Sequence, residues 1–76
     1  MPPKLSRLSG EETRRALERL GFTRVRQRGS HVILKKQVEN GELTCVVPSH
    51  KELAIGTLRS ILRQAKVTPD EFLEYL

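Results

Sequence analysis

Two histidines are the side chains of this sequence best suited to move a proton. His31 follows Gly29 and Ser30, and His50 follows Ser49. Histidine exchanges protons near neutral pH, so it can take a proton from a ribose 2′-hydroxyl or give one to a leaving 5′-oxygen. Nothing in the sequence shows that the two histidines meet. His50 is therefore either a second proton-transfer partner or a loop residue beside the helix that follows, and we favour the loop residue.

The surroundings of His31 are strongly basic. No acidic residue occurs between Glu18 and Glu39, and the chain carries 14 Lys and Arg against 9 Asp and Glu, a formal net charge of +5. The segment holds six basic residues: Arg19, Arg24, Arg26, Arg28, Lys35 and Lys36. A field of one sign attracts polyanions, and arginines can hold a phosphate and offset charge developing on it. A solvated strand surface is the alternative explanation.

The length of 76 residues predicts a single domain over 1–76, with 1–7 as a loosely held arm. A chain this short has no room for a deep substrate cavity. Any site should therefore be a shallow surface feature, which suits a polymer better than a small metabolite. With 37% hydrophobic and 30% charged residues, the composition is that of a folded protein.

The single cysteine, Cys45, excludes an intrachain disulfide and a cysteine-rich metal site. It stands in an apolar run, which predicts a buried and unreactive thiol. No apolar stretch approaches the roughly 18 residues of a membrane span, and no signal peptide opens the sequence. We therefore expect a cytoplasmic protein with no membrane partner.

The spacing of apolar and capping residues predicts six elements. Ser9 and Glu12 form a capping box that begins a helix over 10–20, and Gly21 ends it. Strands are expected over 22–28, 31–38 and 42–47, joined by two-residue turns at Gly29-Ser30 and Asn40-Gly41, the latter of type I′. A second helix covers 55–66, with an apolar stripe of Ile55, Leu58, Ile61, Leu62 and Ala65. A short helix follows Thr68, with Phe72, Leu73 and Leu76 as its apolar face.

The order α-β-β-β-α-α indicates an α+β fold with a three-stranded antiparallel sheet and helices on one face. By topology alone this layout is similar to a double-stranded-RNA-binding domain.

Two-residue turns also fix which strand residues face each other. Arg28 is then opposite His31 and Arg24 opposite Lys35, while Val38 meets Leu43. The predicted core face holds Val25, Val32, Leu34, Val38, Leu43, Cys45 and Val47. The predicted open face holds Arg24, Arg26, Arg28, His31 and Lys35. A slip by one residue would turn apolar side chains outward, so the pattern supports this register. Lys36 fits badly on the core face and must lift its charge out at the rim, while Ile33 and Val46 fall on the open face.

Two segments carry a resemblance to a known family. The run from Gly21-Phe22 to Gly29-Ser30-His31, followed by a basic strand, resembles the HicA toxin family. So does the run VVPSHKELAIGTLRSILRQAKVTPDEFLEYL, whose most specific part is Gly56-Thr57-Leu58-Arg59-Ser60-Ile61-Leu62. The resemblance covers nearly the whole chain. One departure is that His50 is followed by Lys51, where some members have a glycine shortly after that histidine, which puts only the shape of this loop in doubt.

The resemblance implies a small mRNA-cleaving toxin with a double-stranded-RNA-binding-like fold, neutralised by a HicB-type antitoxin protein. The catalytic histidine of the family follows the Gly-Ser pair and falls on His31. No metal or cofactor is implied. The resemblance, the basic pattern and the phosphate contacts expected at the start of the second helix together give the RNA-binding candidates. They are Arg24, Arg26, Arg28, Ser30, Lys35, Lys51, Thr57, Arg59 and Arg63.

Two other functions remain possible from the sequence. A non-catalytic double-stranded-RNA-binding module would need the basic face but not His31. A DNA-binding protein is disfavoured because no recognition helix with base-reading residues is present. Phe22 and Tyr75 are the candidates for base stacking, although we expect Phe22 in the core and Tyr75 holding the last helix, which argues against single-strand stacking platforms.

Overall fold

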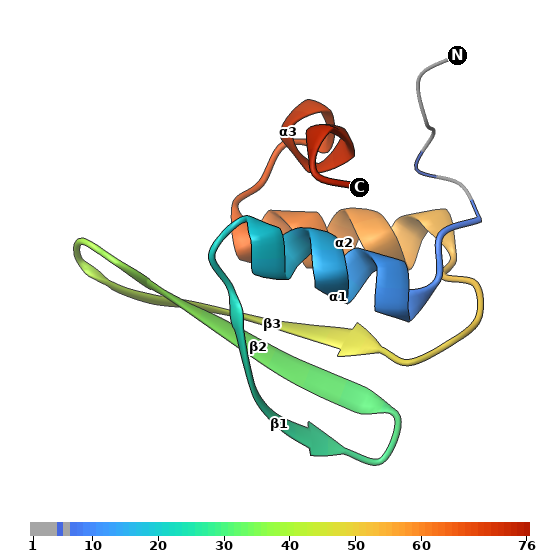
Figure 1. Cartoon of the computed structure of the whole chain (residues 1–76), viewed down its shortest axis with the longest axis horizontal. Helices are drawn as coiled ribbons and strands as arrows, with labels where there is room; N and C mark the ends of the chain where they lie inside the picture. Colours follow the sequence, from blue (N-terminus) through green and yellow to red (C-terminus); the bar gives the residue numbers. More distant parts are fainter. Residues whose placement is uncertain (1–4, 6) are drawn as a thin grey trace.

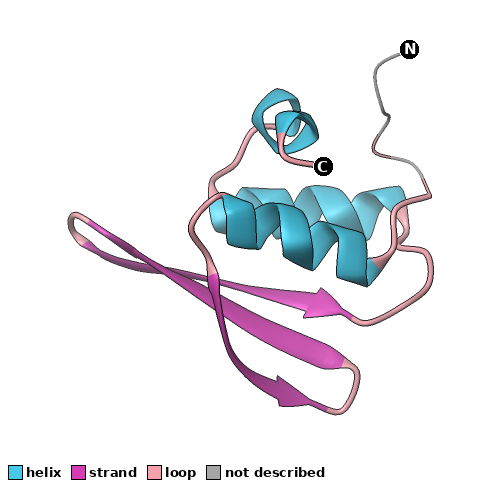
Figure 2. Ribbon diagram, in the orientation of Figure 1, coloured by secondary structure: helices cyan, strands magenta, loops and turns pink. Residues whose placement is uncertain are grey.

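The computed structural model describes residue 5 and residues 7–76, so residues 1–4 and 6 of the expected N-terminal arm lie outside the described part. The elements are α1 (Gly10–Arg19), β1 (Thr23–Arg28), β2 (His31–Val38), β3 (Gly41–Pro48), α2 (Ile55–Ala65) and α3 (Pro69–Glu74). The three strands form one antiparallel sheet in the order β1-β2-β3. Figures 1 and 2 show α1 and α2 on the same side of this sheet, with α3 beyond them. The predicted element order and the double-stranded-RNA-binding-like fold class are confirmed.

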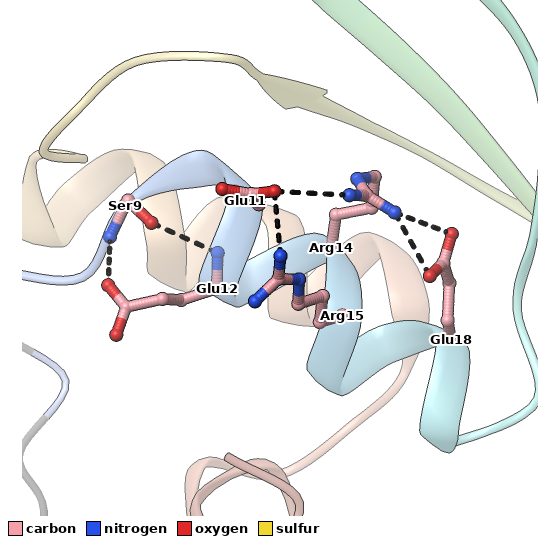
Figure 3. Close-up of polar contacts among 6 residues, drawn as sticks. All are labelled: Ser9, Glu11, Glu12, Arg14, Arg15 and Glu18. Atoms are coloured by element: carbon pink, nitrogen blue, oxygen red, sulfur yellow. Dashed lines mark hydrogen bonds and ion pairs between the residues drawn. The ribbon is translucent and has the colours of Figure 1, made fainter.

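Helix α1 begins as its sequence predicts. The backbone N–H of Ser9 donates to Glu12 Oε1 over 2.9 Å, and the N–H of Glu12 donates to Ser9 Oγ over 3.0 Å (Figure 3). This capping box satisfies two of the donors that the first helical turn leaves open. Leu20 is the C-cap and Gly21 follows with a φ of +105°, so the predicted glycine stop is confirmed. Among the described residues, no helix is long and apolar enough to cross a membrane.

The core lies between the sheet and the helices. Strands β2 and β3 supply Val32, Leu34, Cys45 and Val47, each at most 4% exposed. The helices supply Ala16, Leu17, Leu58, Ile61, Leu62, Ala65 and Phe72, and Phe22 joins them. These assignments agree with the predicted core. Cys45 is buried as predicted, and burial raises the pKa of its thiol to about 11, which disfavours the reactive thiolate form.

The β2–β3 pairing differs from the expected register by two residues. Val38 pairs with Gly41 and Leu34 with Cys45, so the loop is Glu39-Asn40. A type I′ turn needs positive φ at both loop residues. Here the positive φ, +140°, falls on Gly41, and the predicted turn type is wrong. Because side chains alternate with a period of two, a shift of two leaves every residue on its predicted face.

The β1–β2 hairpin agrees with the prediction only near its turn. Arg28 pairs with His31, as expected, and Gly29 has a φ of +57° that glycine adopts readily. A β-bulge then interrupts β1 between Arg24 and Arg26, so Arg24 pairs with the buried Leu34 instead of Lys35. A bulge adds one residue and breaks the regular alternation.

Two predictions fail at this bulge. Val25 is 48% exposed and is not part of the core. Arg24 leaves the open face and belongs to the side of the sheet on which α1 lies.

Three further apolar residues are more exposed than predicted. The β2–β3 tip extends past the helices in Figure 1, so Val38 is 39% exposed. Ile55 at the start of α2 and Leu76 after α3 are also exposed. Lys36 behaves as expected at the rim: its ammonium lies 5.8 Å from the centroid of the Phe22 ring, a distance that allows a cation–π interaction.

Gly10 is required by a close approach between α1 and the end of β3. Its N–H donates to the His50 carbonyl oxygen over 2.8 Å, and a Cβ at this position would overlap the Pro48 carbonyl oxygen. We expect Gly10→Ala to destabilise the protein by about 1–3 kcal/mol, because backbone must move to admit the methyl group. Thermal unfolding followed by circular dichroism measures this, at roughly 4–8 °C per kcal/mol for a domain of this size.

Gly56 in α2 is the matched control, since a Cβ there would meet nothing within 4 Å. Gly56→Ala should be neutral or stabilise the chain by up to about 1 kcal/mol through helix propensity. If both variants melt at the same temperature, the close packing at Gly10 is contradicted.

Glu42 predicts an acid-sensitive contribution to stability. Its carboxylate lies 3.1 Å from Lys35 Nζ and accepts a hydrogen bond from Gln37 Nε2 over 2.9 Å. The Lys35 and Gln37 contacts hold the pKa of Glu42 below its ordinary value of 4.5. A lowered folded-state pKa stabilises the protein above the unfolded-state pKa, and this stability is lost as pH falls through the folded-state pKa.

We therefore expect Glu42→Gln to lower the melting temperature at pH 7, with the difference from the parent shrinking as pH falls below about 4.5. Glu39→Gln removes the same charge from the adjacent loop, where none of the ion pairs found among the described residues involves Glu39, and should leave the melting temperature at pH 7 close to that of the parent. A melting difference for Glu42→Gln that stays constant from pH 7 to pH 3 would contradict the pairing.

Candidate active site

His31 opens strand β2 and lies exposed on the face of the sheet opposite the core. Its pairing partners are Arg28 on β1 and Pro48 on β3. The side chain lines a shallow hollow of about 400 Å³ between the end of the sheet and α2. The other lining residues are Val46, Pro48, Gly56, Thr57, Ser60, Ile61 and Gln64. A surface hollow agrees with the expectation that a chain of this length has no deep cavity.

Helix α2 supplies the polar wall of this hollow. It packs mainly against β3, with Leu58, Ile61 and Leu62 buried against the sheet. Thr57, at the edge of this buried stripe, was among the predicted RNA-binding residues. The neighbouring Ser60 was not predicted, nor was Gln64 one turn further on. Their spacing from Thr57 of three and seven residues places all three on one helix face, and that spacing was the available signal.

The turn before His31 is fixed from both sides. The N–H of Ser49 donates to the Ser30 carbonyl oxygen over 2.6 Å, which joins the β1–β2 turn to the segment after β3. Gln27 Nε2 donates to the Gly29 carbonyl oxygen over 2.9 Å. Together with the pairing of His31 to Arg28 and Pro48, these bonds define the backbone position of the first residue of β2. Ser30 itself is exposed beside His31.

The predicted basic residues divide into several groups. Arg28 and Arg26 share the open face with His31, through their pairing with His31 and Ile33. Lys35 is on the same face but is paired with Glu42. Arg59 and Arg63 are exposed on α2 without lining the hollow.

The second histidine is separated from the first. His50 lines a different groove on the α1 side of the sheet, which also includes Arg14, Arg24 and Lys51. His31 is not among the residues lining that groove, and His50 is not among those lining the hollow. This arrangement agrees with the interpretation of His50 as a loop residue.

The hollow therefore offers a limited set of chemical groups. His31 supplies the one imidazole among the residues that line the hollow, and Thr57 and Ser60 add hydroxyls. Imidazole can act as base and then as acid within one reaction. An arginine directly across the strand pair can bind an anionic substrate group and stabilise charge that develops on it. The arrangement suits proton transfer at a phosphodiester lying on the surface.

Comparison with known proteins gives one family. Residues 10–67 match the family model described as the HicA toxin of bacterial toxin–antitoxin systems. The match spans α1, the whole sheet and α2, and it includes every residue that lines the hollow. No curated protein matches the chain.

Proposed function

This chain belongs to the HicA toxin family, and from that premise we propose that it binds and cleaves mRNA as an endoribonuclease. The observation that carries the proposal is the position of His31. It is exposed in a hollow beside hydroxyl groups of α2, with Arg28 as its cross-strand partner. A shallow hollow next to a basic strand surface suits a polyanion better than a small molecule. With mRNA as substrate, the protein would act in the cytoplasm.

The proposed reaction is attack of a ribose 2′-hydroxyl on the adjacent phosphorus. His31 removes the proton of the 2′-hydroxyl as the new bond between the 2′-oxygen and phosphorus forms. The bond from phosphorus to the 5′-oxygen breaks, and the protonated imidazole returns a proton to that leaving oxygen. The products are a 2′,3′-cyclic phosphate and a free 5′-hydroxyl. The residues already present supply the base and the acid in this scheme, with no metal or cofactor in either step.

The remaining predicted residues take binding roles in this proposal. Arg28 and Arg26 contact the scissile phosphate and its neighbour, because they extend from the same face as His31. Ser30 and Thr57 supply hydroxyls beside the hollow. Arg59, Arg63 and Lys35 lie further out, where they interact with phosphates along the strand. The ion pair with Glu42 reduces the contribution of Lys35.

A HicB-type antitoxin is the proposed protein partner. To inhibit the toxin it must block access to His31, and the nearest surface is the basic strand with Arg26 and Arg28. An acidic or aromatic segment is the complementary chemistry for such a surface. A partner of this kind would compete directly with RNA.

His31→Gln tests the proposed catalysis. Loss of the proton-transfer group should lower cleavage of mRNA by at least about a hundredfold, the scale of general acid–base catalysis. RNA affinity should change little, because the basic surface is retained. Cleavage is measured by primer extension on a purified transcript, and affinity by fluorescence anisotropy.

His50→Gln is the control, since it removes the other imidazole from a separate groove and should leave kcat at saturating RNA close to that of the parent. If His31→Gln cleaves as fast as the parent, the catalytic assignment is wrong. A chain that binds double-stranded RNA tightly without cleaving any RNA would instead support the non-catalytic binding module.

Protection of His31 tests the antitoxin proposal. Diethyl pyrocarbonate modifies accessible imidazoles, and both histidines are exposed in the free chain. We expect a HicB-type antitoxin, when bound, to protect His31 more than His50, as read by mass spectrometry of the peptides. Equal modification of His31 in the free and bound chains would place the partner elsewhere.

A further inference from the structure

A second basic groove lies on the side of the sheet that faces α1. Its volume is about 440 Å³. It is bounded by the first turns of α1, by strand β1 and by the segment that follows β3. Its polar lining is formed by Ser9, Glu11, Arg14, Arg24, Gln27, Ser49, His50 and Lys51. Arg24 belongs here only because of the bulge in β1, which turns it away from the face that carries Arg26 and Arg28.

The charges of α1 that line this groove are already paired. Arg14 lies 3.0 Å from Glu18, and Glu11 lies 2.9 Å from Arg15 and 3.8 Å from Arg14 (Figure 3). The other two cations of the groove are Arg24 and Lys51. Unlike Arg14, neither has a carboxylate within 4 Å among residues 5 and 7–76. The uncompensated charge of the groove is therefore positive, with the imidazole of His50 beside it.

The apolar side chains of the groove expose little surface. They are Val32 and Val47, which are 4% and 1% exposed. A ligand here cannot gain much from hydrophobic burial, because that free energy scales with the apolar area removed from water. Donors from arginine, lysine, serine and glutamine favour a phosphate chain over an apolar protein segment.

The groove and the hollow of His31 lie on opposite sides of one short rim. His31 points to the hollow, while the next residue, Val32, lines the groove. The rim between them is formed by the backbone of Ser30 and Ser49, which a hydrogen bond joins, and by the adjacent Pro48, which lines the hollow. A single RNA strand that crosses this rim can contact both the groove and the hollow.

We propose that this groove is a second phosphate-binding subsite for the RNA strand whose scissile bond lies at His31. The inference rests on the proposed function, since it needs an RNA substrate. Arg24 and Lys51 bind phosphates of that strand on the α1 side, while Arg26 and Arg28 hold it on the open face. The strand thus wraps around the end of the β1–β2 hairpin, and residues on both sides of the sheet fix its position.

The double variant Arg24→Gln and Lys51→Gln tests this subsite. It is made in the His31→Gln background, so that a fluorescently labelled single-stranded oligoribonucleotide stays intact during anisotropy measurements. We expect affinity at 0.1 M salt to fall by roughly tenfold. The slope of log affinity against log salt should become shallower by about 1.4, because each phosphate contact with a single strand contributes about 0.7.

The matched control is Arg19→Gln with Lys66→Gln, which removes two positive charges at exposed positions outside both sites. Its affinity and salt slope should stay close to those of the His31→Gln parent. Arg24→Lys, alone in that background, should keep the parental salt slope, since it retains the charge. In the His31-containing chain, the double variant should raise KM while leaving kcat nearly unchanged, because the groove holds the strand and not the reacting atoms.

Several results would overturn the subsite. One is a double variant that keeps the RNA affinity and salt slope of the His31→Gln parent, when that parent binds RNA. The proposed function would then stand without the groove. An equal loss in the matched control would show general charge attraction instead. Loss of antitoxin binding with RNA binding retained would assign the groove to an acidic protein segment. A parent that binds no RNA would refute the proposed function and the subsite together.

Discussion

Strand β2 is paired with β1 on one side and β3 on the other, and the burial of its alternate residues sets the face on which its remaining side chains lie. Val32 and Leu34 are packed into the core at 4% and 0% exposure, so His31 and Ile33 must point the other way. A shift of β2 by one residue would bury His31 and Lys35 and expose the two apolar side chains, a change that costs several kcal/mol. The orientation of His31 is thus held by hydrophobic burial on the opposite face.

Two close backbone approaches convert this orientation into a site. Gly10 lets α1 pack directly on the segment around Pro48, and the Ser49–Ser30 hydrogen bond ties that segment to the β1–β2 turn. The chain then enters α2 beside the end of the sheet at which β2 begins and β3 ends. Thr57 and Ser60 therefore lie next to His31 although they are separated from it by more than a strand and a loop. The hollow of His31 and the groove on the α1 side lie next to these two approaches.

Ion pairing leaves unpaired positive charge on β1, within the segment 19–38 that contains His31 and no acidic residue. Acidic side chains of α1 pair with Arg14 and Arg15, and Glu42 pairs with Lys35. These exposed pairs contribute little stability, but they remove those cations from the attractive field. Arginines of β1 have no such partners among the described residues, and they lie on both faces of the β1–β2 hairpin, in which His31 directly follows the turn.

The sequence by itself determined the element order, the caps, most of the core and the face on which His31 lies. These features follow from local signals, such as the Ser9–Glu12 capping box and the alternation of Val32 and Leu34. It also carried the family, which the match over residues 10–67 confirms. The tertiary structure decided what depends on contacts between distant segments: the bulge that moves Arg24 to the α1 side, the exposure of Val38 beyond the helices, and the separation of His50 from His31. A bulge leaves a regular pattern of residue types unchanged, and a hollow forms only when helix and sheet pack, so neither can be derived from spacing along the chain.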